Sequence, residues 1–247
     1  MENDVKVQVR HLTKKFGDLL VLNDVSFDIM RGELLCVVGP TGCGKTTFLN
    51  TLTKIYDITS GKILVDGKPV DPKVQNISYI FQGDSTMPWL TVEQNVAFGL
   101  EIKHCPEDKK RELVEKYLNV VGLTDYRNYY PKQLSASMLQ RVSIARAFAT
   151  EPELLLMDEP YGQLDIDLRF KLEDELVKLW KMTGTTVLFI THNVEEAVYL
   201  SSHVMVLTNK PTTVKTILKN DLPRPRDIAD PAFVEMRNEV TRLIKWW

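Results

Sequence analysis

A glycine-rich run is the feature of this sequence that most constrains its fold: Gly39–Pro40–Thr41–Gly42–Cys43–Gly44–Lys45–Thr46. It fills every position of the Walker A pattern, and it lies after an apolar stretch of strand length, Leu34–Val38, and before a helical stretch, Lys45–Lys54. Glycines let backbone N–H groups converge on phosphate oxygens, and the start of the helix adds its dipole. We therefore predict a nucleotide-binding loop in which Lys45 pairs with the β- and γ-phosphates and Thr46 offers a hydroxyl to Mg²⁺, with Thr47 beside it.

Strand and helix patterns alternate along the chain. Apolar runs predict strands in the first thirty residues, at Lys62–Val65 and at Ile77–Phe81, Leu154–Met157, Val187–Ile190 and Val204–Leu207. Helices are expected at Thr91–Ile102, Pro106–Val121, Met138–Ala149 and Asn193–Leu200. Such alternation implies a largely parallel sheet. The predicted fold is an α/β core with an antiparallel β subdomain at the front and an α-helical subdomain inserted at about residues 86–150. With the Walker A run, this core resembles that of P-loop NTPases of RecA type.

Composition excludes several classes of protein. The chain of 247 residues has a net charge of −2, which argues against a duplex-binding protein and leaves no nucleic acid among the expected partners. Its start is not a signal peptide, and no apolar run approaches the roughly 20 residues that span a bilayer. Any membrane connection is therefore expected to run through another protein. Three cysteines without metal-ligand spacing suit a reducing compartment.

Two carboxylates, Asp158 and Glu159, follow the apolar run Leu154–Met157. The carboxyl ends of strands are where α/β proteins carry their ligands. Asp158 is the expected Mg²⁺ partner, and an ionised Glu159 would accept the proton of an attacking water. An acidic pair at a strand end can also simply cap a helix or loop, but the glycine-rich loop upstream favours the functional interpretation.

The segment from Leu134 to Ala147, LSASMLQRVSIARA, resembles the signature of ABC ATP-binding proteins, whose usual head is LSGGQ and whose tail is QRVAIARA. Further landmarks of that family follow in order: an aromatic residue for adenine stacking (Phe16), the Q-loop glutamine (Gln82), the D-loop (Gly162–Asp165) and the switch histidine (His192). The chain is thus similar to the ATP-binding subunits of ABC transporters from Phe16 to about Arg226.

This resemblance implies an ATPase that binds ATP and Mg²⁺. It implies catalytic roles for Glu159, His192, Gln82 and Lys45, and it adds Gln82 to Thr46 and Asp158 as metal-binding residues. It also implies a site completed by a second ATP-binding subunit, to which Ser135, Ser137 and Asp165 contribute. The resemblance suggests an ATP-binding domain over residues 1–222 and a short C-terminal extension over 223–247, in which the Pro- and Arg-rich stretch Asp221–Asp230 is a surface connection to a final helix.

The head of the signature departs from the family pattern, because Ala136, Ser137 and Met138 replace two glycines and a glutamine. Side chains in place of glycine can crowd a phosphate. We favour a working but weakened composite site in a homodimer. The alternatives are a heterodimer with a sister subunit that carries LSGGQ, and a degenerate ATPase.

Two stretches indicate which transporter the chain resembles. Pro88–Val96 and Leu222–Arg226 look like the PWLTVxxNV and LPRPR segments of importer ATPases of the nitrate, sulfonate and taurine group. The resemblance implies uptake of a small solute, with membrane permease subunits as partners, a solute-binding protein as an indirect partner and a peripheral location on the cytoplasmic face of the membrane. An exporter or extraction ATPase and a non-transport ABC ATPase are the alternatives. Met87 and Trp89 either contact the permease or pack inside the helical insert.

Overall fold

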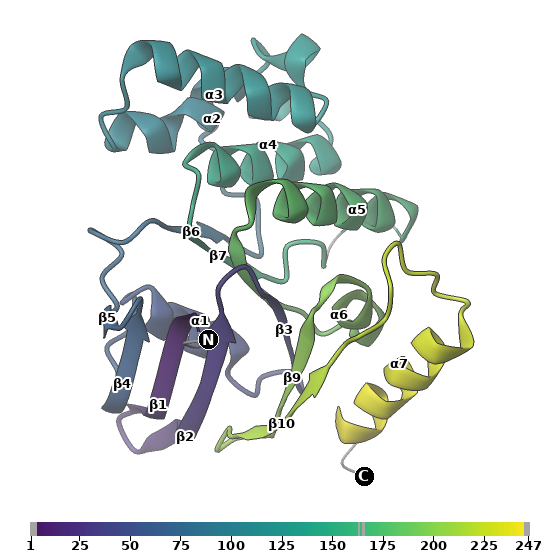
Figure 1. Cartoon of the computed structure of the whole chain (residues 1–247). Helices are drawn as coiled ribbons and strands as arrows, with labels where there is room; N and C mark the ends of the chain where they lie inside the picture. Colours follow the sequence, from purple (N-terminus) through teal and green to yellow (C-terminus); the bar gives the residue numbers. More distant parts are fainter. Residues whose placement is uncertain (1–3, 163, 165, 245–247) are drawn as a thin grey trace. The chain divides into compact units, whose positions relative to one another are not determined.

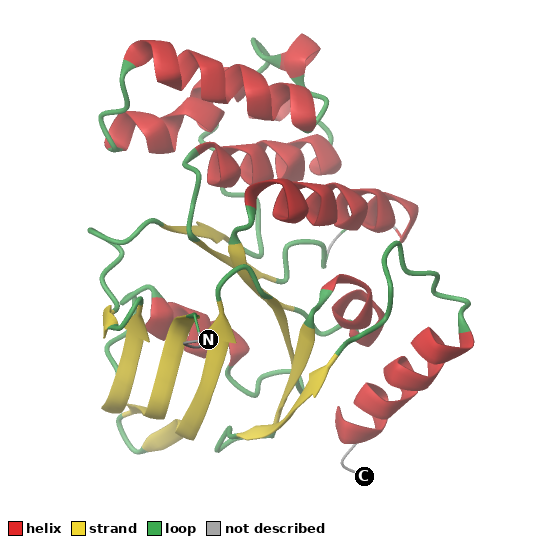
Figure 2. Ribbon diagram, in the orientation of Figure 1, coloured by secondary structure: helices red, strands yellow, loops and turns green. Residues whose placement is uncertain are grey.

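The computed structural model describes residues 4–162, 164 and 166–244. Backbone contacts divide these residues into two compact units: a first unit made of residues 4–75 and 186–244, and a second unit made of residues 76–185. Ribbon views show strands and helices in both units (Figures 1 and 2).

The first unit holds an antiparallel sheet with the strand order β2-β1-β4-β5. Its strands are β1 (Val5–Phe16), β2 (Leu19–Met30), β4 (Ser60–Val65) and β5 (Lys68–Pro69). Inward-facing residues of β1 such as Val7 and Val9 are fully buried. A buried cation, Lys6, is neutralised in the same sheet by Asp66, whose Oδ2 lies 2.6 Å from the lysine Nζ. The sheet therefore combines a buried apolar face with an ion pair at its margin.

A second sheet of the first unit contains strands in the order β10-β9-β3-β8. They are β3 (Leu34–Val38), β8 (Thr186–Ile190), β9 (His203–Leu207) and β10 (Val214–Lys219). β3 runs parallel to both β8 and β9, and β10 runs antiparallel to β9. Every residue of β3 and β8 is buried, as expected for parallel strands covered on both faces. This burial explains why both strands are continuous apolar runs in the sequence.

Three helices complete the first unit. They are α1 (Lys45–Leu52), α6 (Val194–Leu200) and α7 (Pro231–Ile244). α1 ends two residues before the predicted Lys54, because Thr53 is its C-cap and Lys54 adopts a left-handed φ of 55°. α7 buries Phe233 and Val240 and packs against α6 and β9.

The described residues of the second unit form two parallel strands and four α-helices. These are β6 (Ile77–Ile80), β7 (Leu154–Asp158), α2 (Val92–Ile102), α3 (Glu107–Val120), α4 (Ala136–Ala149) and α5 (Ile166–Thr183). Helices α2, α3 and α4 pack on one another around residues such as Val96, Leu118 and Phe148, each fully buried (Figure 1). No helix in the described ranges is both long and apolar enough to cross a membrane.

The predicted fold class is confirmed: an α/β architecture with parallel strands, an antiparallel sheet and a helical segment between β6 and β7. Besides the end of α1, three details differ from the prediction. α4 starts at Ala136 rather than Met138, because Ser135 caps it. β10 was not predicted, although its residues alternate between half-buried and exposed. The Asp221–Asp230 stretch is not purely a surface connection, since Arg226 within it is only 9% exposed.

Candidate functional site

The glycine-rich loop of the first unit joins β3 to α1, as the sequence predicts. Gly42 and Gly44 adopt φ values of 75° and 113°, which side-chain-bearing residues rarely adopt. A Cβ at Gly44 would lie 2.8 Å from Cγ1 of Val21, whereas one at Gly42 would meet no atom within 4 Å. The loop backbone at Gly42 is therefore open to a ligand, and that at Gly44 is closely packed.

Lys45 is the first residue of α1 and is 6% exposed. Its Nζ donates hydrogen bonds to the carbonyl oxygens of Gly39 at 3.0 Å and Pro40 at 3.2 Å, which hold the ammonium over the loop. The next residue, Thr46, is exposed and Thr47 is half-buried. A buried cation beside an exposed hydroxyl is the arrangement that fits a phosphate with its metal ion.

Cys43 contributes its backbone to the loop rather than its thiol. The side chain is 2% exposed, and burial raises the pKa of the thiol, so that it is protonated at neutral pH. Its carbonyl oxygen accepts a hydrogen bond from Oγ1 of Thr212, a residue that is itself fully buried. Thr212 is a support of the loop that sequence reasoning missed, because 169 positions separate it from Cys43 and no local pattern marks it.

Phe16, at the end of β1, keeps 41% of its surface exposed. Its ring and that of Tyr56 form a T-shaped pair with 5.2 Å between ring centroids, and the Lys14 ammonium lies 4.5 Å from the Phe16 centroid. Lys14 is held in place by a hydrogen bond to the carbonyl of Asp57 at 2.6 Å. An aromatic ring with exposed area and a fixed orientation is suited to stacking on a base.

His192 follows β8 in the first unit, and its side chain is exposed. The residue before it, Thr191, donates its N–H to the carbonyl of Val37 at 3.1 Å, close to the start of the glycine-rich loop. The residue after it, Asn193, caps α6 by accepting hydrogen bonds from two backbone N–H groups of the first turn. The histidine is thus held between a sheet and a helix start.

Asp158 is the last residue of β7 in the second unit, and Glu159 directly follows it. Asp158 is 3% exposed, and the hydroxyl of Tyr79 on the neighbouring strand lies 3.4 Å from its Oδ2. Burial, and then the charge of Asp158, raise the pKa of Tyr79, so that its hydroxyl stays a donor. Tyr79 was not predicted as a site residue; its only sequence signal is its place on the strand that precedes Gln82.

Glu159 adopts a left-handed φ of 44° directly after the strand. Its Oε2 lies 3.4 Å from Nε2 of Gln82, a residue separated from it by 77 positions. The second unit therefore brings together two of the predicted catalytic residues. A non-glycine residue with positive φ at a strand end is a conformation often found at functional positions.

Ser135 is the N-cap of α4, and its Oγ accepts from the N–H of Met138 at 3.4 Å. The hydroxyls of Ser135 and Ser137 lie 2.9 Å apart. Neither Ala136 nor Ser137 has a positive φ, so side chains at these positions cause no backbone strain. The start of this helix presents two hydroxyls and its first N–H groups together.

The segment before α2 is shaped by a fully buried residue, Asn95, which donates to the carbonyls of Met87, Leu90 and Thr91 and accepts from the N–H of Met87. Sequence reasoning did not single out Asn95. Trp89, in the same segment, is 73% exposed and therefore does not pack inside the helical insert, whereas Met87 is half-buried.

The predicted residues are thus distributed over both units. The first unit contains the glycine-rich loop, Phe16 and His192; the second contains Gln82, Asp158, Glu159 and the start of α4. Asp165 lies outside the described residues. Among the residues that the structure describes, no cluster of three or more His, Cys, Asp or Glu side chains could hold a metal ion by itself.

Comparison with known proteins identifies the family. Residues 22–162 match the ABC transporter family. An uncharacterized ABC transporter ATP-binding protein of Methanocaldococcus jannaschii is 43% identical over 245 residues, which cover 98% of this chain and 92% of that protein. The chain belongs to the ABC transporter family.

This ABC ATP-binding subunit is also similar to two proteins with more specific names. The aliphatic sulfonates import ATP-binding protein SsuB of Bacillus cereus is 34% identical, over 96% of this chain and 93% of that protein. The structure of cbiO1 from Clostridium perfringens, part of the ABC transporter complex cbiONQ, aligns with a TM-score of 0.80 and 26% identity over 97% of both chains. The P-loop NTPase fold and the resemblance to ABC transporter ATP-binding proteins are therefore confirmed, and the family is one of ATP-binding ATPases.

Proposed function

We propose that this ABC ATP-binding subunit binds ATP with Mg²⁺ and hydrolyses it, and that hydrolysis powers uptake of a small solute through membrane partner subunits. The observation that carries the proposal is the glycine-rich loop. Lys45 is buried with its ammonium fixed by two loop carbonyls, and Gly42 places no side chain between the backbone and a ligand. These features suit a loop that surrounds phosphate oxygens with N–H groups and one cation.

The chain's residues would take the following roles. Phe16 would stack on adenine and Lys45 would neutralise the β- and γ-phosphates. Thr46, Gln82 and Asp158 would hold Mg²⁺, which when bound neutralises charge on the phosphate oxygens.

In the proposed reaction water attacks the γ-phosphorus, the bond to the β,γ-bridging oxygen breaks, and ADP and inorganic phosphate are released. Glu159 would accept the proton of the attacking water, and Gln82, which lies 3.4 Å from it, would help to place its carboxylate. His192 would hold the γ-phosphate or the water around it. Charge neutralisation and in-line positioning account for most of the catalysis in such a reaction.

A second ATP-binding subunit would complete the site with Ser135, Ser137 and Asp165. We favour a homodimer, with a heterodimer as the alternative. The Oγ atoms of Ser135 and Ser137, 2.9 Å apart at the start of a helix, support binding of an anion there.

The double substitution Ala136→Gly with Ser137→Gly tests whether the departure from LSGGQ weakens hydrolysis. We expect ATP turnover to rise, because removing the Ala136 methyl group and the Ser137 side chain relieves crowding of the γ-phosphate by more than the loss of the Ser137 hydroxyl costs, while the helix loses about 0.5–1 kcal/mol of stability per glycine. Steady-state ATPase rates and thermal unfolding measure the two effects separately. Unchanged turnover would show that these side chains do not crowd the phosphate.

The direction of transport is proposed from the sulfonate import relative and from the Pro88–Val96 and Leu222–Arg226 segments. Exposed Trp89, on a segment fixed by buried Asn95, supports a contact with a permease on the cytoplasmic face of the membrane. Reconstituting the complete transporter into vesicles tests this. Import predicts that solute moves toward the compartment that holds ATP and this subunit, and an exporter predicts the opposite direction.

The decisive test of the catalytic assignment is Glu159→Gln in the transporter complex. ATP binding should stay intact, and turnover should fall by roughly 10²–10⁴-fold, the usual contribution of a general base. Glu112→Gln, on the exposed face of α3, is the matched control and should keep wild-type turnover. Equal turnover in the wild type and the Glu159 variant would refute the role of this residue.

A further inference from the structure

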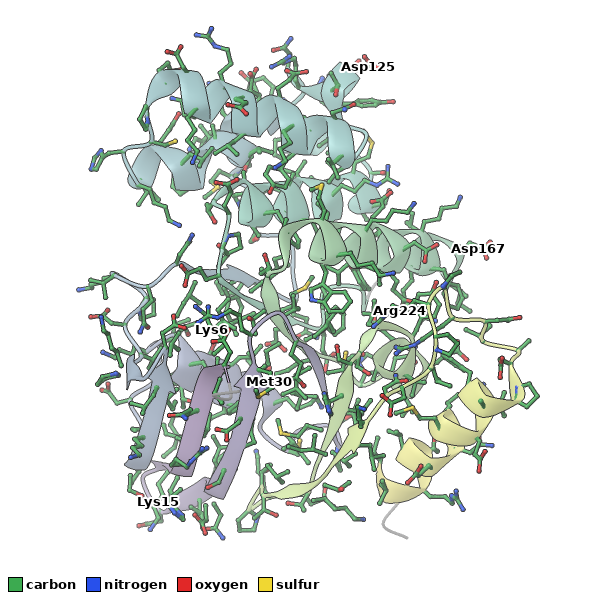
Figure 3. All side chains as sticks on the ribbon, in the orientation of Figure 1. Lys6, Lys15, Met30, Asp125, Asp167 and Arg224 are labelled. Atoms are coloured by element: carbon green, nitrogen blue, oxygen red, sulfur yellow. The ribbon has the colours of Figure 1, made fainter. Side chains whose placement is uncertain are left out.

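The Arg-Pro-Arg sequence at residues 224–226 lies against α6, the helix that directly follows His192. Figure 3 labels Arg224 on the segment that passes beside this helix. Arg226 is 9% exposed and Arg224 is half-buried, although the stretch has the composition of a surface loop. Both guanidinium groups point into the protein, where they contact backbone carbonyls.

These contacts lie at the C-terminal end of α6. Nη1 of Arg226 donates to the carbonyls of Val198 at 2.7 Å, Tyr199 at 2.8 Å and Ser201 at 2.7 Å. Arg224 donates to the carbonyls of Tyr199 and Ser201, both at 3.1 Å, and to that of Leu200. The last carbonyls of a helix have no partner within it, and cations there interact favourably with the helix dipole.

The arrangement places two positive charges, those of Arg224 and Arg226, close together in a partly buried position, and it requires arginine at both. Burial and the neighbouring Arg224 charge lower the pKa of Arg226 to about 10, which leaves it protonated at neutral pH. Only the planar guanidinium group offers several donors in a fixed geometry to such a set of carbonyls. α6 is only seven residues long, a length at which a helix is marginal without tertiary contacts.

The N-terminal end of α6 is anchored as well. Asn193 caps the helix, and the Thr191 N–H bonds to the β3 carbonyl of Val37. Nη1 of Arg237, on α7, lies 3.3 Å from Oε2 of Glu195 in the first turn. His192 therefore lies between a fixed strand and a helix that residues of the C-terminal extension hold at both ends.

We propose that Arg224 and Arg226 are positioning residues for His192: by binding the C-terminal carbonyls of α6 they fix the helix whose start sets the place of the histidine. This inference rests on the proposed role of His192 at the γ-phosphate. Loosening the carbonyl contacts frays a two-turn helix and displaces the histidine, while the glycine-rich loop that binds ATP is unchanged. The effect falls on kcat and leaves KM for ATP in place.

The test uses Arg224→Lys and Arg226→Lys in the full-length chain, each alone and combined with His192→Ala. We expect each lysine variant to lower kcat about 10-fold with KM for ATP within about twofold, since displacing a catalytic group by about 1 Å can cost about 100-fold in rate. In the His192→Ala background the lysine variants should have no further effect on kcat. Arg242→Gln, an exposed position on α7, is the control and should match the wild type.

The outcomes separate this inference from the proposed function. Wild-type kcat in both lysine variants overturns the inference, and so does an equal loss of kcat with and without His192. If Arg226→Lys unfolds, Arg224→Lys alone decides, because its side chain is less buried. Unchanged kcat in His192→Ala refutes the role of the histidine and the inference with it, whereas absence of ATP hydrolysis by the wild type refutes the proposed function itself.

Discussion

Gly44, the N-cap of α1, has φ 113° and ψ 19°, and a Cβ added there would lie 2.8 Å from Cγ1 of Val21. The substitution Gly44→Ala therefore introduces two separate costs. A left-handed backbone costs a side-chain-bearing residue about 1–2 kcal/mol. Val21 is only 2% exposed, and overpacking of such a core position costs about 1–3 kcal/mol.

Together these costs lower the free energy of unfolding by about 2–5 kcal/mol. For a chain of this size the midpoint of thermal unfolding should fall by about 4–20 °C. Circular dichroism during heating measures the shift, and urea denaturation gives the free energy independently.

Gly42→Ala is the matched control within the same loop. Its φ of 75° is also left-handed, but no atom lies within 4 Å of the added Cβ. This variant should lose only the backbone part, about 1–2 kcal/mol. Adding Val21→Ala to Gly44→Ala should recover part of the loss by removing Cγ1. Equal losses in Gly42→Ala and Gly44→Ala would refute the proposed clash with Val21, and wild-type stability of Gly44→Ala would refute both parts.

Two further predictions concern the nucleotide base and acid stability. Phe16→Ala should weaken ATP binding by about 5- to 150-fold, because aromatic stacking on a base contributes about 1–3 kcal/mol. Isothermal titration calorimetry should find the affinity for inorganic triphosphate unchanged. An equal loss of affinity for both ligands would contradict stacking. Burial opposes ionisation of Asp66, but hydrogen bonds from Lys6 and Arg31 outweigh it and lower its pKa. The ionised Asp66 therefore stabilises the fold above its unfolded-state pKa near 4, and this stabilisation is lost as pH falls through the lower folded-state pKa. Asp66→Asn should have a lower free energy of unfolding than the wild type at pH 7 and should lose less of it between pH 5 and 3. Parallel profiles of unfolding free energy against pH would contradict this.

Local sequence patterns predicted most elements because each pattern has a local physical cause. The continuous apolar runs of β3, β7 and β8 are buried on both faces, which is the environment that selects such runs. The errors arose at helix ends, which caps decide: Ser135 starts α4 early, and Lys54 adopts the left-handed conformation just beyond the end of α1. β10 was missed because its residues only alternate between half-buried and exposed, a weaker pattern than the almost continuous burial of its partner β9.

The candidate site likewise has parts that local sequence patterns predicted and parts that they did not. The glycine-rich loop, the carboxylate pair and the signature are each a run of consecutive residues, so the sequence by itself determined that this is an ABC ATP-binding protein and named the residues proposed for its site. The residues that hold these motifs and their neighbouring helices in place lie far from them in the sequence. Tyr79 reaches Asp158 across 79 positions, and Arg226 reaches Val198 across 28.

Only the tertiary structure decided that the arginines of the Leu222–Arg226 segment bind the end of α6, and that Asn95 shapes the segment carrying Trp89. The physical reason is that these residues act through hydrogen bonds to backbone carbonyls. Every residue except proline presents the same N–H and C=O groups, so the identity of the partner leaves no trace in the sequence. Such contacts become visible only when the fold places a side chain beside a backbone carbonyl that is distant in the sequence.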